Sequence, residues 1–352
     1  MNTNKSFTLE QLAEYLERPE TQRPFARYRE ELLEPVPAFT TQEIARLIEI
    51  VKLDSPQYPK FSVSKLLIDL SWASSHLEGN TYTQLDTQVL IEYGKRNEDK
   101  PSEDAAMILN HKKAIGHMIE NPVLNGKNVL AIHKTLADNG MAPDSRHFLE
   151  PGKCGVIRSH TPDDLLINGS SYLPPQVEDR PSGFMEKEFS RLLASANTLP
   201  DAINQSFFIM TRLPYLQPFY DANKRTSRIC CNIPLVRDGL TPLSFVDFDK
   251  KRYLGGLIAF YELGDERLAK SSYLDAYLAT AFRYQPLGED AKFALSIKRD
   301  EQLAAARHYV LNGVREAEPV WLLNRRKKIA AKDAPCKSAP PPKEQSGPSI
   351  ER

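Results

Sequence analysis

Apolar residues recur at helical spacing along most of this 352-residue chain, which limits it to a fold built mainly from helices. Between Ser64 and Leu77 four apolar side chains share one face, and residues 202–213 show the same pattern. Four more stretches have helical spacing: 184–193, 250–263, 265–282 and 298–313. The chain is long enough to bury a substantial core. We therefore predict an all-α fold.

Residues 151–180 are the exception to this periodicity. Two short apolar pieces, Val156-Ile157 and residues 165–167, flank a Thr-Pro-Asp-Asp turn. Short apolar runs on either side of turn residues are typical of a β-hairpin. We expect one small hairpin within an otherwise helical region.

Composition narrows the classes of function. Lys plus Arg equals Asp plus Glu, 46 against 46, which argues against a general nucleic-acid binder. The basic run Arg325–Lys328 is typical of a solvated helix end. No apolar run reaches bilayer length, and the polar N-terminus lacks the apolar core of a secretion signal. The four cysteines fit neither a disulfide framework nor a zinc site: Cys154, Cys230, Cys231 and Cys336. We expect a cytoplasmic protein with no membrane partner.

The segment QPFYDANKRTSR, residues 217–228, carries the strongest chemical signal. It lies between two amphipathic stretches, and Asn223 starts the second. Unpaired N–H groups and the helix dipole favour a phosphate there. Three cations strengthen that preference: Lys224, Arg225 and Arg228. Asp221 could hold Mg²⁺, which takes few protein ligands. On chemistry alone, a solvated basic helix start with a loop aspartate remains an alternative.

This segment resembles the signature of the Fic family, His-Pro-Phe-x-Asp/Glu-Gly-Asn-Gly/Lys-Arg-x-x-Arg, in order and spacing. The resemblance extends over roughly residues 61–282. It implies a Fic core that uses ATP and Mg²⁺, with Asp221 as the metal ligand and Phe219 as a buried anchor. The hairpin would be the family's flap, residues 155–171, where an unknown target protein docks by strand addition. The resemblance assigns the nucleotide phosphates to Ala222, Asn223, Lys224, Arg225 and Arg228.

A second motif lies upstream, in Ser74-Ser75-His76-Leu77-Glu78-Gly79-Asn80. It resembles the Ser/Thr-x-x-x-Glu-Gly/Asn inhibitory motif of Fic proteins whose inhibitory helix precedes the core. The resemblance implies an inhibitory helix over residues 64–80, in which Glu78 pairs with Arg228 and obstructs the γ-phosphate. Taken alone, Glu78 could equally be a surface residue at a helix end capped by Gly79.

The motif departs from the family at its first position, where Gln217 replaces the catalytic histidine. A glutamine amide cannot titrate near neutral pH, and loss of a general base costs on the order of 10²–10⁴ in rate. We assign no catalytic role to His160, which we place at a solvent-facing turn, to His133, which we interpret as structural, or to His76. The string Ala222-Asn223-Lys224 also resembles the Doc branch, whose members transfer a terminal phosphate.

Two functions of different classes follow. The first is a protein adenylyltransferase that moves AMP from ATP to a Ser, Thr or Tyr hydroxyl and is autoinhibited by Glu78. The second is a nucleotide-binding pseudoenzyme with a regulatory or interaction role; a Doc-like phosphotransferase is a further alternative. Fic proteins often form homodimers, and no residue decides whether this chain does. We expect four parts: N-terminal helices 1–60 packed on the core, the core 61–282, a helical segment 283–330 and a disordered tail 331–352.

Overall fold

The computed structural model describes residues 7–53, 60–163, 165–284 and 289–314, and these are mainly helical. The all-α prediction is confirmed. The helices are α1 (Leu9–Glu17), α2 (Thr41–Val51), α3 (Lys60–Leu77), α4 (Gln84–Tyr93), α5 (Ser102–Glu120), α6 (Gly126–Ala137), α7 (Phe184–Thr198), α8 (Ala202–Leu216), α9 (Asn223–Cys230), α10 (Asn232–Arg237), α11 (Lys250–Leu263), α12 (Arg267–Tyr284) and α13 (Glu289–Asn312). Short 3₁₀ turns occur at Glu20–Gln22, Glu30–Leu33 and Pro151–Lys153. Within the described ranges, none of these helices has the length and apolar character to cross a bilayer.

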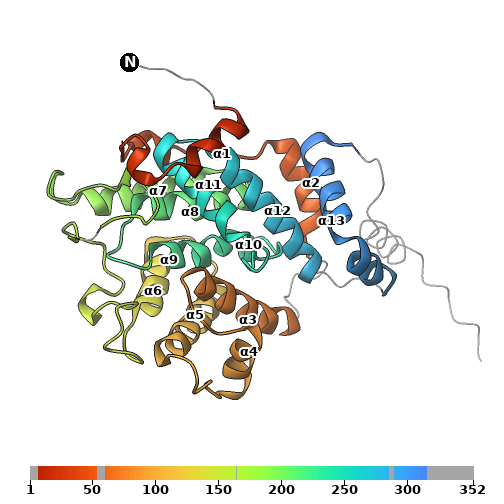
Figure 1. Ribbon diagram of the computed structural model, residues 1–352, viewed down its shortest axis with the longest axis horizontal. Coiled ribbons are helices and arrows are strands. Elements are labelled where there is room, and N and C mark those ends of the chain that lie inside the picture. The colour runs from red at the N-terminus through yellow and green to blue at the C-terminus, as the bar shows by residue number, and fades with distance from the viewer. Residues whose placement is uncertain (1–6, 54–59, 164, 285–288, 315–352) are drawn as a thin grey trace, which may run out of the picture.

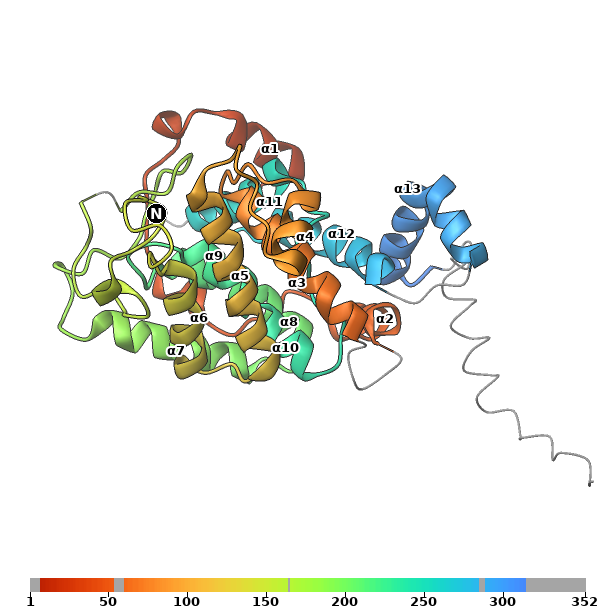
Figure 2. The same cartoon turned by 90° about the horizontal axis from the view of Figure 1, so that it is seen from below.

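Helix α8 forms the centre of the molecule, because every residue from Ala202 to Leu216 is buried. A helix that is apolar on all sides needs neighbours on all sides. Helices α7, α9, α10, α11 and α12 all pack against it. Figure 1 shows α3, α4 and α5 grouped on one side of this centre, and α2 beside α13 at another edge. Figure 2 shows α6, α5 and α9 close together, where the candidate site lies.

The N-terminal segment packs on the core by specific contacts. Thr8 and Thr40 each form a capping box, which explains where α1 and α2 begin. Helix α1 lies on α11, and the Tyr15 hydroxyl donates to the buried Glu262 carboxylate over 2.8 Å. Helix α2 packs on α12 and α13. Helix α13 is longer than the predicted 298–313 and is kinked at Lys298. The predicted tail and the Arg325–Lys328 run lie outside the described residues.

The prediction of two hairpin strands within residues 155–171 is wrong. No strand is present in the described part of residues 155–171. The paired strands are β1 (Ala26–Arg27) and β2 (Tyr172–Leu173), which are parallel with Ala26 opposite Tyr172. Burial does alternate in both pieces, since Val156 and Leu166 are exposed while Ile157 and Ile167 pack on the core, but no ladder of strand hydrogen bonds joins them. Main-chain groups there bond elsewhere: the Arg158 N–H donates to the Pro218 carbonyl over 3.0 Å.

The helical stretch that follows the motif loop is interrupted. It divides at Cys231 into α9 and α10. Pro234 has no N–H to bond the carbonyl four residues earlier, and its ring crowds that carbonyl. At the break itself, the Asn232 side chain donates to the Arg228 carbonyl oxygen over 3.1 Å. This break fixes the C-terminal end of the helix that carries the predicted phosphate ligands.

Candidate functional site

The motif loop, residues 217–222, turns sharply from α8 into α9. Gln217 and Ala222 both have left-handed backbone conformations, with φ of 51° and 59°. Residues with a side chain rarely adopt this conformation, so the loop must be held by its surroundings. Phe219 supplies that hold as the sequence predicted: it is fully buried and its ring stacks on His133 at 3.8 Å.

Both polar atoms of the Gln217 side-chain amide form hydrogen bonds within the protein. Its Nε2 donates to the Pro214 carbonyl over 2.8 Å, and its Oε1 accepts from Asn223 Nδ2 over 2.7 Å. Asn223 in turn accepts from the Phe219 N–H over 3.0 Å. The side chain at the position of the motif histidine therefore helps to close the loop. An amide held in this way has no proton-accepting function near neutral pH.

Arg158, which the sequence analysis did not single out, ties residues 155–171 to the motif loop. Its Nε donates to the Gln217 carbonyl and its Nη2 to the Pro175 carbonyl, each over 2.7 Å. The side chain is fully buried, and among the described residues it has no carboxylate partner. Burial lowers the pKa of Arg158 to about 10. No local sequence signal marks this residue, because its partners are main-chain carbonyls distant in sequence.

A cavity of about 610 Å³ lies between residues 146–166 and the motif loop, a volume suited to a nucleotide-sized ligand. Its walls bring together Arg146, Lys153, His160, Gln217, Tyr220 and Asp221. None of the predicted phosphate ligands lies in this lining, and neither does Glu78; the five are Ala222, Asn223, Lys224, Arg225 and Arg228. Asp221 is half exposed, and its Oδ2 accepts from Arg225 Nη2 over 3.0 Å. No side chain caps the first turn of α9, so its N–H groups remain open to an anion.

Arg228 lies buried behind this loop and pairs with Glu78. The Arg228 Nη2 donates to Glu78 Oε1 over 2.5 Å, and Nε donates to Ser74 Oγ over 2.9 Å. Arg228 has no exposed side-chain surface, while that of Glu78 is 22% exposed. Burial alone would raise the pKa of Glu78, but the positive charges of Arg228, Lys224 and Arg225 outweigh it and lower the pKa to about 2. The predicted pair is formed and charged.

The family model described as the Fic/DOC family matches residues 123–235, which include the motif loop. Residues 123–235 are therefore similar to the Fic/DOC family. It is 25% identical over 249 residues to "Protein adenylyltransferase Fic" of Nematostella vectensis, covering 65% of this chain and 52% of that protein. It is 24% identical over 183 residues to the Drosophila melanogaster protein of the same name, covering 50% and 34%. The chain thus spans about half the length of the first relative and about a third of the second.

Two solved structures are similar to this chain in fold. A fragment of Fic-1 from C. elegans matches with a TM-score of 0.51 at 18% identity, covering 72% of this chain and 70% of that one. A Fic domain containing signaling protein from Bacteroides thetaiotaomicron matches with a TM-score of 0.50 at 19% identity, covering 70% and 98%.

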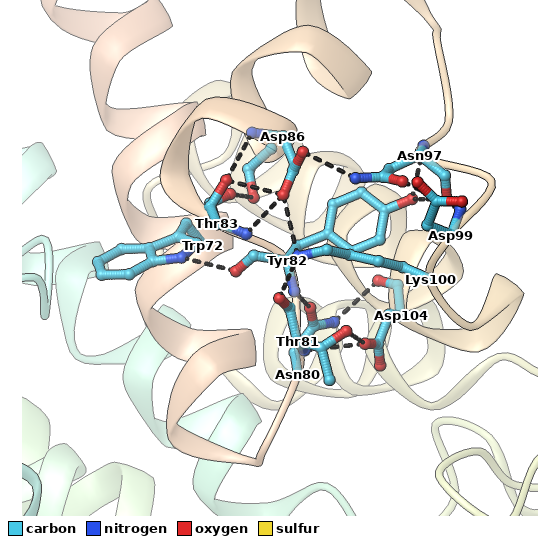
Figure 3. A network of polar contacts seen from close by, with 11 residues as sticks. Trp72, Asn80, Thr81, Tyr82, Thr83, Asp86, Asn97, Asp99, Lys100 and Asp104 are labelled. Atoms are coloured by element: carbon cyan, nitrogen blue, oxygen red, sulfur yellow. Dashed lines mark hydrogen bonds and ion pairs between the residues drawn. The ribbon is translucent and has the colours of Figure 1, made fainter.

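The loop after Glu78 is held between α3, α4 and α5 by a polar network (Figure 3). The Asp104 carboxylate accepts from the Thr81 N–H over 2.8 Å, and the Asp104 carbonyl accepts from Asn80 Nδ2 over 2.9 Å. The Tyr82 N–H donates to Asn80 Oδ1, and Trp72 donates to the Tyr82 carbonyl. A further bond to the Asp86 carboxylate comes from Thr83. These contacts fix where α3 ends and hence where Glu78 lies.

Another buried residue that sequence reasoning missed is His111 of α5. Its Nε2 lies 2.9 Å from Ser74 Oγ, and its Nδ1 lies 2.8 Å from the Met107 carbonyl. Burial is the largest of the effects that lower the pKa of His111 to about 3, so the ring is neutral at physiological pH. The signal in the sequence was only a histidine within an amphipathic helix, a pattern that does not identify a partner.

The three histidines to which we assign no catalytic role divide into one buried residue, His133, and two exposed ones, His76 and His160. His133 accepts from the Gly155 N–H over 2.9 Å and its Nε2 lies 3.1 Å from the Asp221 carbonyl, consistent with the structural interpretation. Burial lowers the pKa of His133 to about 3. His76 stacks on Trp72 at 5.2 Å. His160 is exposed, as expected, but lines the cavity and lies 3.1 Å from the Tyr220 hydroxyl.

Proposed function

We propose that this chain is a nucleotide-binding Fic protein that transfers AMP from ATP to a hydroxyl of a protein target. Glu78 restrains it. The observation that carries the proposal is the Glu78–Arg228 pair, whose buried Arg228 lies on the helix that follows the motif loop, while Asp221 of that loop lines a nucleotide-sized cavity. The name of the Nematostella vectensis relative supports adenylyl transfer as the reaction.

The residues of the site suit Mg²⁺ and a polyphosphate. Asp221 offers a half-exposed carboxylate on the cavity wall, and Mg²⁺ commonly takes one or two carboxylates with water and phosphate completing its shell. When bound, the ion would neutralise phosphate charge and polarise the phosphoryl group. The open N–H groups at the start of α9, together with Lys224, would orient the phosphates.

In this proposal Arg228 holds the terminal phosphate once it leaves Glu78. As long as both Nε and Nη2 face α3, that edge of the guanidinium is not available to a ligand. The target would approach across residues 155–171, where exposed Val156 and Leu166 and main-chain groups not paired in a sheet offer a docking edge. Positioning and electrostatics would supply catalysis, because Gln217 provides no base.

A specific observation favours a second candidate. The Gln217 amide closes the motif loop through Pro214 and Asn223, as expected if this position had become structural. Under this reading the protein binds nucleotide without transferring it, and the Glu78–Arg228 pair responds to the nucleotide as a switch. Its output would then be an interaction with a partner.

Labelled ATP separates these functions. Wild type and Glu78→Gly are incubated with Mg²⁺, a bacterial lysate and ATP labelled at either the α- or the γ-phosphate. The proposal predicts α-label on protein, stronger with Glu78→Gly. Label from the γ-phosphate alone would indicate Doc-like phosphotransfer. If ATP binds but neither label is transferred, the adenylyltransferase proposal fails and the nucleotide-binding pseudoenzyme replaces it.

A further inference from the structure

We propose that His111 is a positioning residue of the inhibitory pair: it orients the Ser74 hydroxyl that holds Arg228 against α3. Helix α5 then belongs to the restraint together with α3. The inference rests on the proposed function, because it assumes that Arg228 must leave α3 to bind a phosphate. All three side chains are fully buried, so water does not compete for their hydrogen bonds.

The direction of each hydrogen bond follows from the partners. A carbonyl oxygen can only accept, so the His111 Nδ1 carries a hydrogen and donates it to Met107 O over 2.8 Å. The nearby cations Arg228 and Arg225 disfavour a second proton on the ring. The Nε2 of a neutral His111 is therefore an acceptor.

The hydroxyl of Ser74 connects this acceptor to Arg228. An arginine N–H can only donate, so Arg228 Nε donates to Ser74 Oγ over 2.9 Å. The one hydroxyl hydrogen of Ser74 is then free to donate to His111 Nε2, also over 2.9 Å. Each donor therefore meets an acceptor along this chain of hydrogen bonds, which runs from Met107 O through His111 and Ser74 to Arg228 and is called the relay below. A serine within a helix otherwise tends to turn its hydroxyl back to the carbonyl one turn earlier, and His111 offers a stronger partner.

The relay restrains one edge of the guanidinium. Arg228 bonds α3 at three points, through Nε to Ser74 Oγ and through Nη2 to the Ser74 carbonyl and Glu78. Its Nη1 has no hydrogen-bond partner among the described residues. Since the contacts lie on the edge facing α3, each of them must break before this edge can turn to a phosphate. His111 thus acts through Ser74 and touches no nucleotide.

The test compares ATP with ADP, which lacks the terminal phosphate. Dissociation constants for both, with Mg²⁺, are measured by calorimetry for wild type, His111→Gln, Ser74→Ala, the double variant and Glu78→Gly. We expect His111→Gln to tighten ATP binding roughly two- to tenfold, the range of one hydrogen bond, and to leave ADP binding unchanged. Adding His111→Gln to Ser74→Ala should change nothing further. His117→Gln, on the same helix, is the matched control and should leave the ATP-to-ADP ratio unaltered.

The outcomes separate the inference from the function on which it rests. If Glu78→Gly itself fails to tighten ATP binding, the proposed restraint is wrong. If Glu78→Gly tightens it but His111→Gln leaves the ATP-to-ADP ratio unchanged, the role of His111 is overturned. An equal effect of His111→Gln with and without Ser74→Ala would also overturn it. Should His111→Gln not fold, Ser74→Ala breaks the same relay without a large cavity, and an unchanged ratio there rejects the relay.

Discussion

Glu78 and Arg228 are 150 residues apart in sequence, yet their side chains meet over 2.5 Å at the back of the motif loop. Arg228 is the fully buried partner, and its positive charge is among those that keep the pKa of Glu78 low. A buried arginine that loses its carboxylate is costly unless another anion replaces it. The pair is therefore suited to exchange Glu78 for a phosphate.

Removing the glutamate should weaken the free protein. Glu78→Gly leaves the buried Arg228 unpaired, and we expect its free energy of unfolding to fall by roughly 2–4 kcal/mol, with Mg²⁺·ATP restoring part of the loss. Glu98→Gly is the control, because Glu98 pairs with Arg96 on the exposed surface, where solvent screens the pair, and its loss should be much smaller. Urea unfolding with and without nucleotide measures both. Equal losses in the two variants would contradict a buried charge pair.

Restoring the motif histidine should restore transfer. In the Glu78→Gly background, Gln217→His should raise the rate of AMP transfer by about 10²–10⁴ if only the base is missing. The measured quantity is α-label incorporated per minute, with Gln217→Asn, which keeps an amide, as the control. A double variant that binds ATP but gives no more label than Glu78→Gly would mean that the site has diverged at more than one position.

The metal ligand can be tested by binding alone. Asp221→Ala should remove the dependence of ATP affinity on Mg²⁺, because Asp221 is the carboxylate of the motif loop that lines the cavity. Asp163→Ala changes another carboxylate in the same lining and should keep that dependence. Titrations of ATP with Mg²⁺ and with chelator compare the two. Persistent Mg²⁺ dependence in Asp221→Ala would exclude Asp221 as the ligand.

Arg158 should prove essential to the geometry of the motif loop. Arg158→Met keeps a long apolar side chain but leaves the Gln217 and Pro175 carbonyls without their donor. Hydrogen bonds from a charged group contribute about 1.5–3 kcal/mol each, so we expect a clear drop in Tm and faster proteolysis within residues 155–171. Arg180→Met, further along the chain and more exposed, should change neither. Unchanged proteolysis in Arg158→Met would argue against this tie.

Acid should destabilise the fold through His111. Its pKa is about 3 in the folded protein and near 6.5 when unfolded, so the unfolded state binds the extra proton. The stability is fully present above pH 6.5 and is lost as the pH falls towards 3, by at most about 1.4 kcal/mol per pH unit. Between pH 7.5 and 5.0, wild type should lose about 2 kcal/mol more than His111→Gln. Urea titrations at both pH values test this, and parallel losses would contradict it.

The sequence predicted the helical elements well where periodicity and capping agree. The helix expected over 250–263 has those bounds, and it begins after Asp249, whose side chain accepts from the Arg252 N–H as an N-cap. The pattern could not exclude a hairpin at 155–171, because burial alternates there as in a strand while main-chain groups bond outside the segment, as the Arg158 N–H does to the Pro218 carbonyl. The interruption at Cys231 depends on Pro234, whose presence alone does not distinguish a bend from a break.

Only those residues of the candidate site that belong to the two motifs could be predicted from the sequence. The loop geometry and the Glu78–Arg228 pair followed from two motifs resembling those of a family. His111 and Arg158 did not, because each acts through hydrogen bonds to partners from distant segments: His111 to Ser74 and Arg158 to the Gln217 carbonyl. Such long-range polar contacts leave no periodic signal in a single sequence.

The affinity of Mg²⁺·ATP for wild type and Glu78→Gly, measured side by side by calorimetry, tests the central claim most directly. If Glu78 occupies the place of the terminal phosphate on Arg228, Glu78→Gly should bind ATP roughly tenfold or more tightly than wild type, with ADP much less affected. Equal ATP affinity in the two proteins, both folded, would show that the pair does not restrain nucleotide binding.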